Sequence, residues 1–182
     1  MNSLPTAHDV VSYWRTAGSK QWFSKDPAFD ADFKSRFEEM HHAAARGALD
    51  DWSANAEGAL ALLVLLDQFP RNAYRDSGHM FATDGKALAI ADAAITAGLD
   101  MKIDTDLRAF FYMPFMHSES LAVQERSVVL CAGFNQPGTL RFAILHRDII
   151  RRFGRFPHRN AVLGRDTTPE ERAFLDGGGF PG

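Results

Sequence analysis

The chain has 182 residues, of which 46% are hydrophobic and 24% are charged, and its formal net charge is −3. This length and composition predict a single globular domain over residues 1–182. A sequence pI near 6.1 argues against a general nucleic-acid-binding protein, which usually carries a basic surplus.

No targeting or membrane segment is evident in the sequence. The N-terminal stretch lacks the basic start and long apolar run of a secretory signal peptide. The longest apolar run, Ala59–Leu66, has eight residues, far fewer than the ~20 that span a bilayer. We therefore expect a soluble, cytoplasmic protein with no membrane partner. The single cysteine, Cys131, excludes an intramolecular disulfide, and its apolar neighbours predict a buried, inert thiol.

The first third of the chain shows apolar residues at helical spacing. A first helix is predicted over about 8–16, with Gly18 as a stop signal. A strongly amphipathic helix follows over about 27–46. The next helix, about 56–69, is apolar on all sides, which predicts a central position, and Pro70 is expected to end it.

The rest of the chain continues the helical pattern. We expect a helix over 84–97 capped by Asp84, an aromatic-rich segment at 106–117 that Pro114 breaks or kinks, a helix from Ser118 or Ser120 to about Phe134, an arginine-rich helix over 139–155, and a short helix opened by a capping box at Thr168–Glu171. No stretch reads as a convincing strand. The predicted fold class is therefore all-α, built from antiparallel helix pairs.

Positive charge is concentrated in residues 141–165. This segment contains seven arginines, no lysine and one acid, Asp148, so its formal charge is +6 in a chain whose other residues sum to −9. The planar guanidinium group suits carboxylates and phosphates and tolerates burial better than an ammonium group does. The segment is either a structural ion-pair hub or an anion-binding site, and the sequence leaves both open.

The arginine-rich helix has an inward face that includes a histidine. This face is predicted to hold Phe142, Ala143, Ile149, Ile150 and Phe153, together with His146. One interpretation is a histidine satisfied within the core beside a solvated ridge of Arg147, Arg151 and Arg155. The other is an anion site, because Arg155, His158 and Arg159 continue the charge past the end of the helix.

Glu125 interrupts an apolar stripe on the preceding helix. The stripe is formed by Leu121, Val128 and Ala132, so we expect Glu125 to be largely buried and paired with an arginine or histidine of the next helix. His117 and Glu119 lie just before this helix. Although such residues can bind metals, the usual metal-ligand spacings are absent, so no metal or other cofactor is expected.

Two short stretches resemble each other. Residues 67–72 read DQFPRN and residues 155–160 read RFPHRN, each after a strongly apolar helix. The arginine and asparagine side chains could donate hydrogen bonds to the free backbone carbonyls at the end of a helix that stops before proline. Alternatively, the two stretches could line one cleft with guanidinium and amide groups.

Longer motifs resemble a known family. LLDQFPRNAYR at 65–75, FFYMPFMHSESLAVQERSV at 110–128 and HRDIIRRFGRFPHRN at 146–160 are similar to an uncharacterised, largely bacterial family, the domain of unknown function number 924. The resemblance covers nearly the whole chain and implies a tetratricopeptide-like helical domain, with no established activity. Ser120 stands where the family usually has an acid, which weakens a metal role at that position.

These observations predict a helical ligand-binding or interaction module. Its Arg- and His-lined cleft would take a small anionic ligand or a peptide end, and the chain lacks a nucleophile motif and a Gly-rich phosphate loop. The alternative is a hydrolase with Glu125 or His146 as acid/base and arginines that stabilise negative charge. The sequence does not decide whether the protein is an enzyme, nor its oligomeric state. The expected ligand-binding residues are Asp67, Arg71, His117, Glu119, Arg151, Arg155, His158, Arg159 and Asn160.

Overall fold

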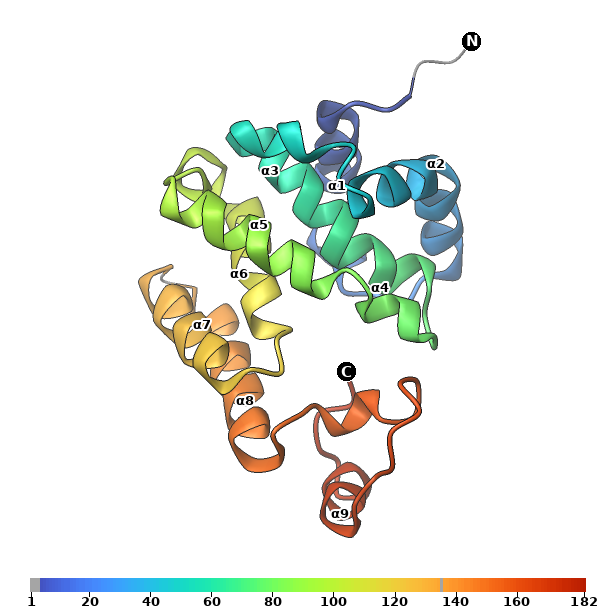
Figure 1. The fold of residues 1–182 in the computed structure, drawn as a ribbon, viewed down its shortest axis with the longest axis vertical. Coiled ribbons are helices and arrows are strands. Elements are labelled where there is room, and N and C mark those ends of the chain that lie inside the picture. Colours follow the sequence, from blue (N-terminus) through green and yellow to red (C-terminus); the bar gives the residue numbers. More distant parts are fainter. Residues whose placement is uncertain (1–3, 135) are drawn as a thin grey trace. The chain divides into compact units, whose positions relative to one another are not determined.

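The chain folds into helices. The computed structural model describes residues 4–134 and 136–182, and within these ranges no residue is in a strand (Figure 1). The α-helices are α1 (Ala7–Trp22), α2 (Pro27–Ala45), α3 (Ala56–Leu63), α4 (Phe69–Ala73), α5 (Asp84–Thr96), α6 (Thr105–Met116), α7 (Leu121–Gly133), α8 (Pro137–Phe153) and α9 (Pro169–Asp176). Short 3₁₀ helices are η1 (Asp50–Ala54), η3 (Gly78–Phe81), η4 (Asp100–Lys102) and η5 (Pro157–Arg159), and η2 (Val64–Gln68) is a π-helix. The predicted all-α class is confirmed, and the tetratricopeptide-like arrangement stays a prediction.

Contacts group the residues into two compact units. Unit 1 comprises the residues up to Arg75 together with His79–Pro114, and unit 2 comprises Asp76–Gly78 and Phe115–Gly182. The single domain expected from chain length stays a prediction.

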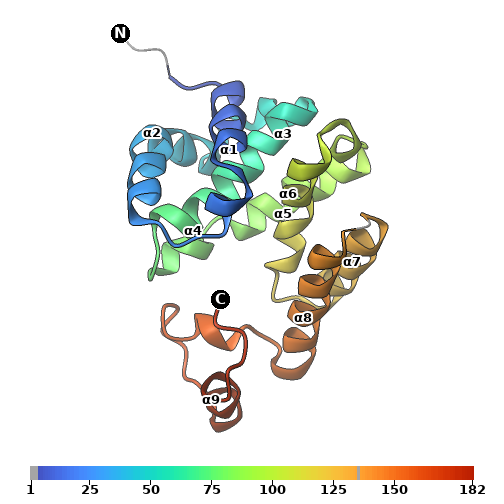
Figure 2. The same ribbon diagram turned by 180° about the vertical axis from the view of Figure 1, so that it is seen from behind.

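Unit 1 is built around the apolar helix that the sequence placed at its centre. All residues from Ala59 to Leu66 are fully buried, and α1 and α5 pack against α3, while α2 packs against η2 and α4 (Figures 1 and 2). Aromatic side chains fill the space between these helices, and Trp14, Phe33 and Phe69 have no exposed surface. The central position predicted for this helix is confirmed.

Pro70 does not end the central helix, contrary to expectation. The helix widens into a π turn, in which the Phe69 N–H bonds to the carbonyl of Val64, and α4 then continues through Pro70. Two backbone carbonyls of η2 receive side-chain donors instead. His41 Nδ1 lies 2.8 Å from the Leu65 oxygen, and Thr83 Oγ1 donates to the Leu66 oxygen at 2.5 Å. These side chains supply bonds that a proline cannot donate.

The interruption predicted at Gly18 is confirmed: its φ of 73° and ψ of 171° are not helical, and a second helical segment of α1 follows and runs to Trp22. Two other positions differ from the prediction. Helix α6 continues past Pro114 to Met116, so Pro114 does not break it. Asp84 is the first residue of α5 rather than its cap, because Arg71 holds its carboxylate at 2.9 Å.

Unit 2 contains the antiparallel pair α7 and α8, which lie side by side in both views (Figures 1 and 2). The buried face of α7 is Gln124, Ser127 and Cys131, so the predicted stripe of Leu121, Val128 and Ala132 is wrong. Leu121 is 41% exposed. The reason is that α7 turns its small and polar side chains, not its aliphatic ones, inward. The buried thiol predicted for Cys131 is confirmed.

The inward face of α8 is largely as predicted. Ala143, His146, Ile149 and Ile150 are buried, whereas Phe142 is 43% exposed, so its predicted inward position is wrong. Helix α8 starts at Pro137, two residues earlier than expected, and ends at Gly154, which adopts the left-handed conformation at φ 72°. The turn expected at 135–138 begins at Asn135, which lies outside the described residues.

Helix α9 begins as the sequence predicts. The Thr168 hydroxyl accepts from the Glu171 N–H, and the Glu171 carboxylate accepts from the Thr168 N–H, which confirms the capping box. Helix α9 packs against η5. The two elements bring residues 156–160 and Glu171 together.

Candidate functional site

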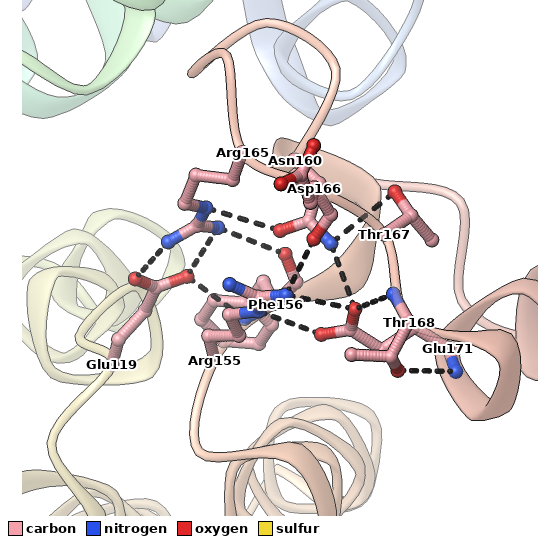
Figure 3. Close-up of polar contacts among 9 residues, drawn as sticks. All are labelled: Glu119, Arg155, Phe156, Asn160, Arg165, Asp166, Thr167, Thr168 and Glu171. Atoms are coloured by element: carbon pink, nitrogen blue, oxygen red, sulfur yellow. Dashed lines mark hydrogen bonds and ion pairs between the residues drawn. The ribbon is translucent and has the colours of Figure 1, made fainter.

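A carboxylate at the start of α7 clamps one arginine of unit 2. Arg165 donates from Nη1 to Glu119 Oε2 at 2.8 Å and from Nη2 to Oε1 at 3.0 Å, and the Phe156 N–H donates to Glu119 Oε1 at 2.8 Å (Figure 3). Burial raises the pKa of Glu119, but the bonds from Arg165 and Phe156 outweigh this effect and leave the pKa below its usual value. Glu119 is therefore ionised and held in place.

A second, more deeply buried carboxylate holds Arg155. Glu171 is 2% exposed and accepts from Arg155 Nε at 2.6 Å and from Nη2 at 2.9 Å (Figure 3). The bond from Arg155 is the main cause that lowers the pKa of Glu171 to about 2, and the Thr168 N–H contributes. This geometry is the bidentate arginine–carboxylate pair.

Asn160 connects the two ion pairs. Its Nδ2 donates to Glu171 Oε2 at 3.1 Å, and its Oδ1 accepts from Arg165 Nε at 3.0 Å. The side chain has no exposed surface. We call Glu119, Arg155, Asn160, Arg165 and Glu171 the carboxylate frame. It fixes the path of the chain from Phe156 to Asn160.

The frame presents a cluster of histidine and arginine side chains. Arg159 lies over the Phe156 ring at 4.6 Å and donates from Nη2 to the His117 carbonyl at 2.9 Å. The rings of His146 and His158 each lie 5.4 Å from that of Phe156. We call His117, His146, His158 and Arg159 the histidine cluster.

His146 is a buried histidine of α8. It is 8% exposed, and neither ring nitrogen has a partner of good geometry among the described residues. Burial is the main cause that lowers the pKa of His146 to about 3; the neighbouring side chains of His117, His158 and Arg159 also lower it, whereas the Met116 carbonyl raises it. The ring is therefore neutral near pH 7 and can both donate and accept.

Glu125 is exposed, so its predicted burial is wrong. Its side chain is 48% exposed and accepts from Arg151 Nη2 at 2.5 Å, which agrees with the predicted arginine partner. Arg151 also reaches Asp148 at 3.3 Å. The buried neighbour of Glu125 is Gln124, whose side chain donates to the carbonyls of Met116 and Ser118, each at 2.7 Å.

Asp67 and Arg71 belong to unit 1, where they form a separate buried group. Arg71 Nη1 lies 2.6 Å from the Asp67 carbonyl oxygen and 3.2 Å from Oδ1, and its two Nη atoms bind both oxygens of Asp84 at 2.9 Å. The other predicted ligand-binding residues lie in unit 2.

The two echoed stretches share a local role. Asn72 donates to Asp30 at 2.8 Å, and Arg75 holds the same carboxylate. Asn160 likewise donates to Glu171, which Arg155 holds. In each case the asparagine amide thus donates to a carboxylate that an arginine also binds. The similarity of the two stretches did not predict this role.

Sequence reasoning missed three residues that build this region. Gln124, Arg165 and Glu171 were not predicted as site residues, and the capping box was the signal that placed Glu171 at a buried helix start.

Among the described residues no group of three or more His, Cys, Asp or Glu side chains is arranged to hold a metal ion, and no helix is long and apolar enough to cross a membrane. A hollow of about 660 Å³ lies on α2, lined by Ser35, Glu38, Glu39, His42 and Arg46, and contains none of the predicted site residues.

The described residues thus define an all-helical protein with a partly buried carboxylate frame beside a histidine cluster. Residues 10–179 match the model of the family described as "Bacterial protein of unknown function (DUF924)", and the chain belongs to this family. It is also similar to the solved structure of a protein of unknown function, ATU0120, from Agrobacterium tumefaciens, with 51% identity, a TM-score of 0.91, and coverage of 94% of this chain and 97% of that one. No curated protein is significantly similar to the chain.

Proposed function

We propose that the protein is a helical ligand-binding module whose histidine cluster binds a small anionic ligand or the anionic end of a peptide. The observation that carries this proposal is the buried imidazole of His146, whose two nitrogens have no hydrogen-bond partner of good geometry among the described residues. An unsatisfied buried polar group costs about 1–3 kcal/mol. Folded proteins usually avoid this cost, so its presence points to a ligand that supplies the missing bond.

The charge around His146 favours an anion. The side chains that act on its pKa are all basic, namely His117, His158 and Arg159. A ligand oxygen with negative charge would accept from the imidazole and would be stabilised by the positive potential around it. A perturbed pKa caused by burial and specific charged neighbours is also typical of functional sites.

In this proposal, Glu119, Arg155 and Asn160 are positioning residues. They belong to the carboxylate frame, which keeps His158 and Arg159 beside His146. Arg151 takes part in an exposed ion pair, and Asp67 and Arg71 belong to unit 1, so we assign none of these three to the ligand.

The hydrolase alternative has less support. Glu125 is bonded to Arg151 in solvent, and no described side chain forms a hydrogen bond of good geometry with His146 to orient it as a base. A pKa of about 3 leaves His146 a weak base near neutral pH.

A thermal-shift titration with phosphate, sulfate and acetate at low ionic strength tests the binding proposal. At 100 times the dissociation constant a ligand stabilises the folded state by ~2.7 kcal/mol, which raises Tm by about 5 °C or more for a chain of this size. His146→Phe keeps a ring of similar shape and should abolish the shift. Arg152→Gln is the matched control, because Arg152 lies on the same helix and its partner is the exposed Glu170. The proposal is wrong if no anion shifts the wild type or if His146→Phe shifts equally.

A further inference from the structure

An aromatic side chain from another segment lies against the histidine cluster. The ring of Phe180 is 4.7 Å from that of His146 at an interplanar angle of 62°, and 5.4 Å from that of His158 at 79°. Each histidine also contacts Phe156. The two imidazoles therefore meet two phenyl rings, one of which, Phe156, is fixed by the carboxylate frame.

Phe180 is attached through three consecutive glycines, Gly177–Gly179, that follow α9. Gly178 has φ 80°, a conformation that favours glycine. A Cβ on Gly179 would lie 2.6 Å from the Phe174 ring, so the path of this segment depends on glycine. Because glycine loses the most conformational freedom when it is ordered, the segment holds Phe180 in place less firmly than a helix would.

Phe180 gives His146 no polar partner. The phenyl ring lies in edge-to-face contact with the imidazole and offers no lone pair, so it packs against this ring without supplying a hydrogen-bond acceptor. A ligand that replaced this phenyl ring with its own ring, and added an anionic group, would keep the aromatic contacts and supply the missing acceptor.

We propose that the ligand displaces the Phe180 side chain from its position beside His146 and His158. We further propose that this ligand is an aromatic anion, namely a planar ring that carries a carboxylate or phosphate group. The ring takes the place of Phe180 between His146 and His158, and the anionic group bonds to His146 beside Arg159. This inference rests on the proposed function and adds the chemical class of the ligand and its competition with residues 177–182.

The test measures binding of 3-phenylpropanoate, which combines the Phe side chain with a carboxylate, by isothermal titration calorimetry. Propanoate has the charge without the ring, and 3-phenylpropan-1-ol has the ring without the charge. If Phe180 occupies its place more than nine-tenths of the time, its removal in Phe180→Ala should strengthen binding of 3-phenylpropanoate about tenfold or more. Propanoate and the alcohol should each bind this variant at least about tenfold more weakly than the acid does.

Gly179→Ala provides a second variant that keeps the phenyl ring. Its added Cβ would collide with Phe174 and shift the segment, so affinity should rise in the same direction. Gly138→Ala on α8 is the matched control, since a Cβ there meets nothing within 4 Å, and it should leave the affinity unchanged.

Two results would overturn the inference. The first is that neither Phe180→Ala nor Gly179→Ala binds 3-phenylpropanoate more tightly than the wild type does. The second is that the alcohol binds as tightly as the acid. If phosphate still stabilises the wild type but not His146→Phe, these results leave the proposed anion site intact. If His146→Phe binds every anion as the wild type does, the proposed function itself has failed.

Discussion

The pair formed by Glu171 and Arg155 should contribute measurably to stability. We predict that Glu171→Gln, which imitates the protonated acid, lowers the free energy of unfolding at pH 7. The pKa of Glu171 is about 2 against an ordinary value of 4.5, and this difference corresponds to ~3 kcal/mol, since one pKa unit is ~1.4 kcal/mol. Arg155 is 28% exposed, and solvent screens part of the interaction, so we expect a loss of ~2 kcal/mol.

The effect should depend on pH in one direction. Because the pKa of Glu171 is lower in the folded state, ionisation adds stability above about pH 4.5, and this stability is lost as the pH falls toward about 2. The difference between wild type and Glu171→Gln at pH 3 should therefore be less than about half its value at pH 7.

Urea unfolding at the two pH values measures both quantities. Glu170→Gln is the matched control, because Glu170 is the neighbouring residue, is 63% exposed and has one bond to Arg152, and it should change stability by at most about 0.5 kcal/mol. The reasoning is refuted if Glu171→Gln unfolds at the wild-type midpoint at pH 7, or if its deficit is as large at pH 3.

Three further predictions concern other parts of the chain. Gly58→Ala should destabilise by about 2 kcal/mol in urea unfolding, because its Cβ would lie 2.0 Å from the Trp52 carbonyl, whereas Gly85→Ala, with nothing within 4 Å, should be neutral or stabilising; equal effects would contradict this. Glu125→Ala should cost less than about 1 kcal/mol, because the Glu125–Arg151 pair is exposed, and a loss above about 3 kcal/mol would mean that the pair is buried. The lowered pKa of His146 should reduce stability as the pH falls below about 6.5, since the imidazole then protonates more readily in the unfolded state; His146→Phe should flatten this loss, and parallel wild-type and variant curves would show that His146 has no part in it.

The sequence predicted elements better than it predicted the faces they bury. The apolar run Ala59–Leu66 and the capping box at Thr168 depend on local chemistry, and both appear as expected. The predicted end of the central helix at Pro70 was wrong. The side chains that bond to the backbone carbonyls of η2, His41 and Thr83, come from distant positions in the sequence. Local propensity does not contain such tertiary bonds.

The same limit explains the error at Glu125. The aliphatic stripe of Leu121, Val128 and Ala132 appeared to mark an inward face, yet α7 buries Gln124, Ser127 and Cys131. Gln124 is buried because it can donate to the carbonyls of Met116 and Ser118, which lie outside the helix. Hydrophobic spacing alone does not reveal such partners.

Two arginines of residues 141–165 have the structural role that was one of the two alternatives left open by the sequence. Arg155 and Arg165 are each matched by a carboxylate, and bidentate arginine–carboxylate bonds of this kind fix geometry closely. The apolar core beside them is small, with Ile149, Ile150 and Phe156 as its buried members. A few aliphatic contacts would allow residues 156–160 to shift, whereas bidentate bonds fix their register. The paired arginines are thus structural, and the segment they fix carries His158 and Arg159, the neighbours of His146 in the proposed anion site.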